Sequence, residues 1–145
     1  MNIFFDMDHT LLALDESLRP GTKETFQQIK DDGHDIYVWS GVGIRWPEVR
    51  HHKLESFVTD CFQKPTEQYV EKAKKQGLPV WPDLVIDDYP EVCQAFGGIW
   101  IRPFYFYNAQ DEEMAHMYRV IKEYALTGTS VDIQFHAPPP NGRPL

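Results

Sequence analysis

Two aspartates separated by one residue follow the first apolar run of the chain, in the segment Ile3-Phe4-Phe5-Asp6-Met7-Asp8-His9-Thr10. A charge at the end of a buried strand must be paired or bound to a metal to be tolerated there. Loops at the carboxyl ends of parallel strands are where α/β proteins bind their ligands. In that position, Asp6 and Asp8 offer an attacking carboxylate and an oxygen ligand for a hard cation.

Three more segments with polar side chains follow predicted strands, namely Ser40-Gly41, Lys64-Pro65 and Asp87-Asp88. In a doubly wound parallel sheet such loops gather at one edge. One pocket would then hold the carboxylates of Asp6, Asp8, Asp87 and Asp88, a hydroxyl, backbone N–H groups and one ammonium group. This set of groups is typical of phosphoryl transfer, which depends mainly on positioning and on neutralisation of charge.

Each group has a task in such a reaction. The carboxylates would bind Mg²⁺, which proteins hold through oxygen atoms with several waters retained. Lys64 and the ion would neutralise charge on the phosphoryl oxygens, and Ser40 with its neighbouring N–H groups would orient them. One carboxylate would attack phosphorus. A second carboxyl, with a pKa raised by its neighbours, would protonate the leaving oxygen and then activate water.

The apolar pattern predicts short strands that alternate with helices. The predicted strands are 3–5, 36–39, 57–61, 84–86 and 99–101, and the predicted helices are 22–32, a stretch after Pro47, 66–77 and 111–125. Thr22 and Thr66 are the expected N-caps of two of these helices. Since the strands are apolar on both faces, helices should cover both sides of the sheet. We therefore predict a three-layer α/β/α, Rossmann-like domain with a parallel five-stranded sheet.

Composition narrows the class of protein. A chain of 145 residues predicts one domain, and the net charge of −8 disfavours binding of bulk nucleic acid while leaving a locally basic pocket open. Two cysteines, Cys61 and Cys93, make no disulfide framework and fit a reducing cytosol. A charge appears too early for a signal peptide, and no apolar stretch could span a membrane. We expect a soluble, cytoplasmic protein; a homo-oligomer remains open.

The ordered motifs resemble those of the haloacid dehalogenase superfamily of phosphohydrolases over roughly residues 2–102. The family's Asp-x-Asp-x-Thr corresponds to Asp6-Met7-Asp8-His9-Thr10, and its Ser or Thr after an apolar strand corresponds to Ser40. Its lysine, often followed by proline, corresponds to Lys64, and its acidic pair corresponds to Asp87-Asp88. His9 stands where the family commonly has glycine, which bears on backbone geometry and on the width of the pocket.

The resemblance implies a Mg²⁺-dependent phosphomonoesterase in which Asp6 is the nucleophile and Asp8 the general acid and base. The metal would be bound by the Asp6 carboxylate, the Asp8 backbone carbonyl and Asp88, with Asp87 direct or through water. Contacts to the substrate phosphate are expected from Ser40, Gly41, Lys64, Thr10, His9 and Arg45. The substrate would be a small-molecule or end-group phosphate ester.

The spacing of the motifs leaves no room for a cap domain. A helix and a strand fill most of each interval, both from Asp6 to Ser40 and from Ser40 to Lys64. The chain thus looks like a capless member, which tends to act on large substrates or to use a neighbouring subunit as a lid. We assign residues 1–127 to the hydrolase domain and 128–145 to a proline-rich tail. The tail is expected to be irregular or to pack on the domain or on a partner subunit, and 131–135 could pair as an edge strand or contact a second subunit.

Several segments allow plainer interpretations. The stretch 45–53 reads best as a solvated helix face, with Arg45 the candidate for a substrate contact because it lies nearest Ser40. Adjacent His51 and His52 point apart on a helix and make poor metal ligands. The aromatic run 104–107 could stack a substrate base, although packing or a subunit contact is the favoured interpretation.

Two other functions fit parts of the pattern. A phosphoryl-accepting receiver module also clusters Asp, Ser or Thr and Lys on a parallel sheet, but its lysine comes last in the chain, whereas here Asp87-Asp88 follows Lys64. A catalytically silent binding protein of the same fold is the other alternative. The intact set of motifs disfavours it.

Overall fold

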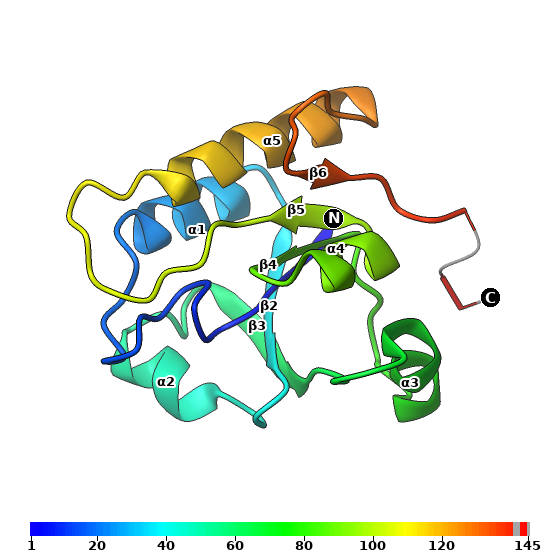
Figure 1. The fold of residues 1–145 in the computed structure, drawn as a ribbon, viewed down its shortest axis with the longest axis horizontal. Coiled ribbons are helices and arrows are strands. Elements are labelled where there is room, and N and C mark those ends of the chain that lie inside the picture. The colour runs from blue at the N-terminus through cyan, green and yellow to red at the C-terminus, as the bar shows by residue number, and fades with distance from the viewer. Residues whose placement is uncertain (141–142, 145) are drawn as a thin grey trace.

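The computed structural model describes residues 1–140, 143 and 144 of the chain. Strands and helices alternate along it (Figure 1). The elements are β1 (Asn2–Phe5), α1 (Thr22–Asp31), β2 (Asp35–Ser40), α2 (Trp46–His51), β3 (Val58–Gln63), α3 (Tyr69–Gln76), β4 (Leu84–Asp87), α4 (Pro90–Phe96), β5 (Gly98–Trp100), α5 (Glu113–Thr127) and β6 (Phe135–His136).

One sheet contains all these strands in the order β3-β2-β1-β4-β5-β6. The first five strands run parallel, and β6 pairs antiparallel with β5. The α/β class and the parallel sheet are as predicted, but the count of five strands was wrong. The two residues of β6 carry no periodicity of their own. They are held instead through neighbouring backbone, where Trp100 N–H donates to the Gln134 carbonyl at 2.8 Å.

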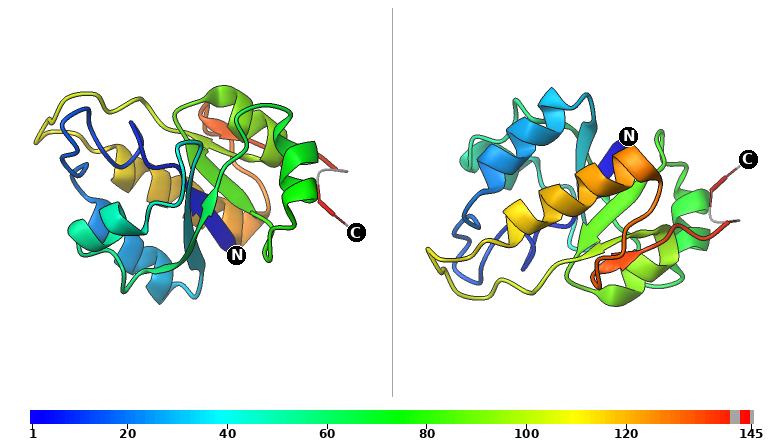
Figure 2. Two further views of the ribbon diagram at one scale, coloured as in Figure 1. Left: turned by 90° about the horizontal axis from the view of Figure 1, so that it is seen from below. Right: turned by 90° about the horizontal axis from the view of Figure 1, so that it is seen from above.

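Alternation along the strands explains the three layers. In β1, Ile3 and Phe5 point into a core that α1, α2 and α5 cover, whereas Phe4 points into a second core that α3 and α4 cover. The other inner strands divide their side chains in the same way. Figure 2 shows α1 and α5 side by side on one face of the sheet, with α3 and α4 on the other. Because both faces are buried, the strands read as continuous apolar runs.

Two helix starts differ from the sequence prediction. Helix α1 is capped by Gly21 in a left-handed conformation, and Thr22 is its first helical residue, with its hydroxyl donating to the Arg19 carbonyl at 2.8 Å. Helix α3 begins at Tyr69 after a left-handed Gln68, so Thr66 is not its cap. Thr66 lies instead against Gly41 in the loop after β2. Threonine is a common cap, but here tertiary contacts decide its place.

The C-terminal segment lies against the domain. Gly97, with φ of 87°, is crossed so closely by the chain that a Cβ there would lie 2.4 Å from Pro138 Cα. Among the residues described, no further domain interrupts the path from β1 to β3. None of the described helices is long and apolar enough to cross a membrane.

Candidate active site

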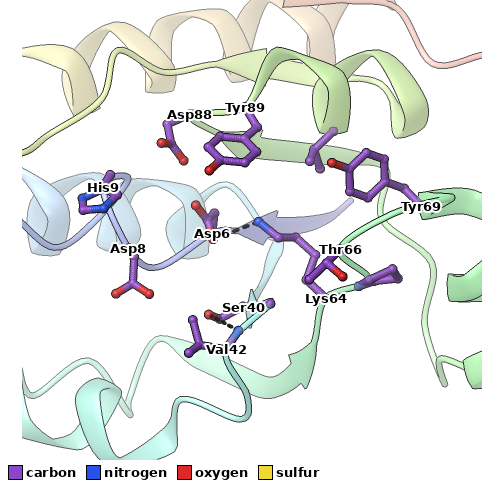
Figure 3. A pocket seen from close by; sticks show the side chains of 13 residues that line it. Asp6, Asp8, His9, Ser40, Val42, Lys64, Thr66, Tyr69, Asp88 and Tyr89 are labelled. Carbon is purple, nitrogen blue, oxygen red and sulfur yellow. Dashed lines mark hydrogen bonds and ion pairs between the residues drawn. The ribbon is translucent and has the colours of Figure 1, made fainter.

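The predicted segments meet at the carboxyl ends of β1 to β4, around a pocket of about 330 Å³ (Figure 3). Seven of the predicted site residues line it, namely Asp6, Asp8, His9, Ser40, Gly41, Lys64 and Asp88. Three others lie behind this lining. Thr10 and Asp87 are fully buried, and Arg45 stands next to Asp8 and Ser40.

The loop after β1 is fixed by backbone hydrogen bonds. Asp6 N–H donates to the Ile86 carbonyl at 3.0 Å, which extends the pairing of β1 with β4 to the first aspartate. The Met7 carbonyl then accepts from Leu11 N–H at 2.9 Å and closes a tight turn. The Thr10 hydroxyl donates to Asp6 Oδ2 at 3.2 Å. Strand pairing and turn together aim the Asp6 carboxylate into the pocket.

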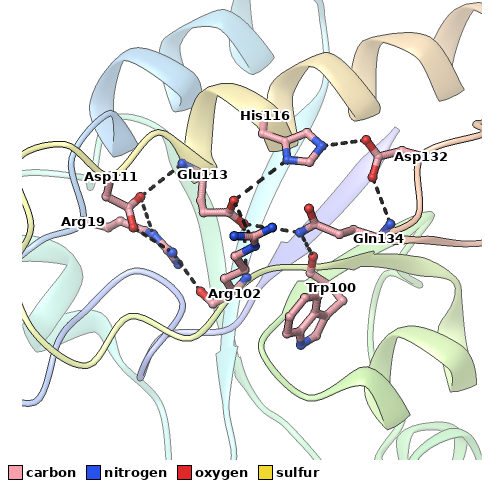
Figure 4. A network of polar contacts seen from close by, with 8 residues as sticks. All are labelled: Arg19, Trp100, Arg102, Asp111, Glu113, His116, Asp132 and Gln134. Atoms are coloured by element: carbon pink, nitrogen blue, oxygen red, sulfur yellow. Dashed lines mark hydrogen bonds and ion pairs between the residues drawn. The ribbon is translucent and has the colours of Figure 1, made fainter.

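Arg19 donates a hydrogen bond to the loop after β1, and no pattern in the sequence predicted this contact. Its side chain is 1% exposed and forms a two-bond ion pair with Asp111 at 2.9 and 3.0 Å. A third bond goes to the Thr10 carbonyl at 3.1 Å. Figure 4 shows Arg19 at one end of a polar network that continues along α5 to the C-terminal segment. A buried arginine beside a paired acid has a positioning role that spacing alone does not reveal.

Lys64 joins two of the carboxylates. Its Nζ lies 3.0 Å from Asp6 Oδ1 and 2.8 Å from Asp87 Oδ2, and the ammonium side chain is only 10% exposed. These charge-assisted bonds keep the Lys64 ammonium protonated, and the nearby carboxylates raise its pKa although burial opposes this. The lysine is therefore a fixed cation at the floor of the pocket.

One carboxylate oxygen from each of Asp6, Asp87 and Asp88 lies within 4.8 Å of the other two, and the three residues are buried. With all three carboxyl groups ionised, Lys64 would supply one positive charge against three negative ones, an excess of negative charge in a desolvated place. A divalent cation with oxygen ligands would balance it, and Mg²⁺ has that ligand preference. The residues present thus fit a bound metal ion.

Crowding also shifts the acidity of the pair after β4. Burial raises the pKa of Asp88 to about 8, with a hydrogen bond to Asp6 and the charges of Asp6 and Asp87 acting in the same direction. Burial and the Asp6 charge raise the pKa of Asp87 to about 6, against the opposing effect of Lys64. Both shifts follow from the same imbalance of charge that a cation would relieve.

Asp8 points away from this cluster. Both of its carboxylate oxygens accept hydrogen bonds from Arg45, at 2.6 and 2.9 Å. Arg45 also contacts Glu48 at 2.7 Å and Ser40 Oγ at 3.1 Å. In the rest of the segment 45–53, Val49 is buried, and the other side chains are exposed or half-buried. Arg45 is thus anchored next to the pocket and not solvated.

The loops after β2 and β3 pack tightly together. Lys64 N–H donates to the Ser40 carbonyl at 2.9 Å, and Ser40 Oγ accepts from Val42 N–H at 3.2 Å. A Cβ on Gly41 would lie 2.9 Å from Thr66 Cγ2, so the contact requires glycine here. This packing holds Ser40 and Lys64 at neighbouring positions of the pocket wall.

His9 adopts a left-handed backbone conformation with φ of 65°. Glycine takes this conformation without strain, which explains why the position can be glycine in proteins with the same motif. Its Nδ1 is buried without a hydrogen-bond partner, and its ring packs edge-on against Tyr105 at 4.9 Å between centroids. With glycine at this position the pocket would lack the imidazole ring that lines it here.

Sequence reasoning missed the other lining residues, which are Val42, Pro65, Thr66, Tyr69, Tyr89 and Val92. Three of them directly follow a predicted motif residue, since Val42 follows Gly41, Pro65 follows Lys64 and Tyr89 follows Asp88. That adjacency was the available signal. His51 and His52 lie on α2 and its C-cap, with rings 4.9 Å apart, and belong to no described metal cluster.

Residues 3–58 match the family model of the haloacid dehalogenase-like hydrolases. The match includes Asp6, Asp8, Thr10 and Ser40, while Lys64 and the acidic pair lie beyond it. No curated protein and no solved structure matches the chain significantly. The matched segment and the Rossmann-like parallel sheet support membership of the chain in the haloacid dehalogenase superfamily, whose members include hydrolases of the phosphatase type.

Proposed function

We propose that the chain is a Mg²⁺-dependent phosphomonoesterase that works through a phosphorylated Asp6. The observation that carries this proposal is the placement of the Asp6 carboxylate, which lines the pocket, is bonded to Lys64 and Thr10, and shares a cluster with Asp87 and Asp88. A carboxylate held in this way is oriented for attack, and its neighbours can compensate the charge of a phosphoryl group.

The reaction would proceed in two displacements. In the first, an Asp6 oxygen bonds to phosphorus while the bond from phosphorus to the ester oxygen breaks, and the leaving oxygen takes a proton. In the second, water attacks the phosphorus of the aspartyl phosphate and gives up a proton. Asp6 is then released with inorganic phosphate, and the atoms and charges balance.

Asp8 is the proposed acid and base for both proton transfers. Because Arg45 donates hydrogen bonds to both of its oxygens, the Asp8 carboxylate must turn away from Arg45 to reach the substrate oxygen or the attacking water. Proximity to the substrate oxygen would then let it protonate the leaving group and later deprotonate water. Lys64 Nζ and the loop Ser40-Gly41 would hold the phosphoryl oxygens during both steps.

The proposed metal ligands are the carboxylates of Asp6 and Asp88 and the Asp8 backbone carbonyl, with Asp87 binding directly or through water. When bound, the ion would neutralise charge on the phosphoryl oxygens and on the carboxylates. Asp88 is the better direct ligand of the acidic pair because it lines the pocket, whereas Asp87 is fully buried behind it.

The test uses p-nitrophenyl phosphate and the variant Asp6→Asn. We expect this variant to lose turnover completely and EDTA to abolish wild-type turnover reversibly, because both nucleophile and cation are required. Asp31→Asn on the exposed face of α1 is the matched control and should keep wild-type activity. Wild-type turnover by Asp6→Asn would refute the mechanism. A stable phospho-Asp6 without turnover would indicate the receiver-like alternative.

We further propose that residues 1–127 form the hydrolase domain of a capless member of the superfamily and that the protein is cytoplasmic. The short connections from β1 to β3 support the first point. Two free, buried cysteines, Cys61 and Cys93, support the second, because an oxidising compartment favours paired cysteines.

A further inference from the structure

The rings of His9 and Tyr89 line the pocket, and the Tyr105 ring packs on His9; the proposed mechanism gives none of these three rings a task. Building on the proposed function, we propose that His9, Tyr89 and Tyr105 form a subsite for the leaving group and select phosphomonoesters that carry a planar aromatic ring. Free nucleoside 5′-monophosphates are the substrate class that this chemistry fits.

Contacts between two loops build the subsite. Phe104 N–H donates to the His9 carbonyl at 2.8 Å, and Leu14 N–H donates to the Tyr105 carbonyl at 2.9 Å. These bonds fasten the aromatic segment to the loop that carries Asp6 and Asp8. The Tyr105 ring then rests against the His9 imidazole, and His9 lines the pocket. Tyr105 is thereby held next to His9, behind the pocket wall, by a backbone bond as well as by ring packing.

Tyr89 reaches the pocket from another loop, directly after Asp88 (Figure 3). Its side chain is 57% exposed, and that of Tyr105 is 47% exposed. Rings that are half accessible at a pocket mouth leave a face free for stacking. Every nucleobase has a π-face that can use it, whatever its hydrogen-bonding groups.

The backbone of His9 is independent support. A residue other than glycine at φ of 65° is strained, and such strain is concentrated at functional sites. No hydrogen bond explains the imidazole, because its Nδ1 is buried without a partner. The chain therefore keeps a ring where glycine would fit more easily. Stacking or edge contact with a flat ligand gives that ring a use.

Charge restricts the ligand to a single phosphate. Of the residues that line the described pocket, Lys64 is the one lysine or arginine, and it is bonded to Asp6 and Asp87. Arg45 nearby is taken up by Asp8 and Glu48. A second phosphate on the leaving group would find no free cation among these groups. A neutral nucleoside meets rings and the exposed Val42 instead.

The pocket size agrees with a free small molecule. About 330 Å³ lies at the low end of small-molecule sites, which span roughly 300–1,000 Å³. A nucleotide at the end of a nucleic acid offers the same base and phosphate, but the net charge of −8 opposes the approach of a polyanion. The free nucleotide is therefore the favoured source of this chemistry.

The experiment compares adenosine 5′-monophosphate with ribose 5-phosphate, which have the same leaving oxygen and differ in the base. We expect kcat/KM to be at least about fivefold higher for the nucleotide, the lower end of what base stacking contributes. The ratio should fall towards one in Tyr105→Ala and in His9→Asn, since asparagine tolerates the left-handed backbone without a ring. Tyr105→Phe should keep the ratio. Tyr107→Ala, an exposed ring on the same loop, is the matched control.

Binding gives a readout that does not need turnover. Calorimetric titration of the Asp6→Asn protein in Mg²⁺ should show tighter binding of the nucleotide than of ribose 5-phosphate. Equal binding together with equal kcat/KM would overturn the subsite and leave the phosphatase intact. Absence of all wild-type turnover with preferential nucleotide binding would overturn the phosphatase and leave the subsite. Faster hydrolysis of a 5′-phosphorylated oligonucleotide would overturn the assignment to free nucleotides.

Discussion

At the residue scale, the single charge of Lys64 does not balance the three neighbouring carboxyl groups, and no second cation pairs with them among the described residues. Asp6 and Asp87 share the one ammonium group, and Asp88 faces the pocket without such a partner among the described ion pairs. In the metal-free protein, the protonated form of Asp88 is therefore the energetically favoured one. Folding, proton binding and metal binding become linked at this residue.

This linkage predicts a pH dependence of stability. The pKa of Asp88 rises on folding from its ordinary value of 3.8 to about 8, so the folded protein binds the proton more tightly than the unfolded chain. The stability that the proton contributes is fully present below about pH 4 and is lost as the pH rises to about 8. In EDTA, the free energy of unfolding of wild type, relative to Asp88→Asn, should fall over this range in urea titrations.

Mg²⁺ should reverse the loss. Because protons compete with the ion at low pH, Mg²⁺ should raise the wild-type Tm more at pH 8 than at pH 5. Asp88→Asn should show little of this difference. A stability difference between wild type and variant that does not change with pH would contradict the proposed linkage.

Lys64 allows a second prediction at this scale. Replacing it by methionine leaves buried carboxylates without their cation, and breaking a buried pair in this way costs about 3–5 kcal/mol. We expect Lys64→Met to lose about that much unfolding free energy in EDTA, to regain part of it in Mg²⁺, and to lose activity. Lys72→Met is the control, because the Lys72–Glu67 pair lies on the surface. An equal effect of both variants would argue against a special role of Lys64.

At the scale of elements, the sequence was most informative where strands end. Apolar runs predicted β1, β2 and β4 to within two residues; β2 and β4 end on a motif residue, and β1 ends immediately before one. Parallel pairing then brings Asp6, Ser40 and Asp88 to one edge whatever the details of the helices. The convergence of the site could therefore be predicted, since it depends on topology more than on side-chain packing.

Loop contacts could not be predicted in this way. The left-handed Gln68 and His9 have no distinctive sequence signature, and the burial of Arg19 depends on Asp111, far away in the chain. The sequence predicts Thr66 as a helix N-cap, but in the structure Thr66 packs on Gly41 instead. Each of these depends on a contact between distant segments, which local propensity does not encode.

The Gly41–Thr66 contact gives a prediction at the scale of elements. A methyl group at position 41 would lie 2.9 Å from Thr66 Cγ2, so Gly41→Ala should force apart the loops after β2 and β3. We expect a loss of about 1–3 kcal/mol in unfolding free energy, typical of overpacking, and a several-fold lower kcat/KM. Thr66→Ser removes the clashing methyl, so the double variant should recover most of both. Failure of the rescue would show that Gly41 is needed for another reason.

At the scale of the whole molecule, the C-terminal segment completes the sheet and reaches the site indirectly. Gln134 Nε2 donates to the Trp100 carbonyl at 2.6 Å, and the Phe135 ring packs on Tyr124 at 5.3 Å between centroids. The Trp100 indole N–H in turn donates to the Asp88 backbone carbonyl at 2.8 Å. Residues 128–140 therefore hold the strand that supports a proposed metal ligand.

Truncation tests this connection. A chain that ends at Gly128 loses β6 and leaves the edge of β5 unpaired, so we expect its Tm to fall by about 5 °C or more. Its Mg²⁺ affinity, measured by calorimetry below that Tm, should also fall, because Asp88 loses part of its support through Trp100. A chain that ends at Pro140 keeps β6 and Pro138 against Gly97, and it should lose much less of either quantity. Gln134→Ala should lie between the two chains, since it removes the bond to Trp100 but leaves the β6 backbone in place. If the chain that ends at Gly128 kept the Tm of wild type, the C-terminal segment would be an accessory to the sheet and Trp100 would be held by β5 alone.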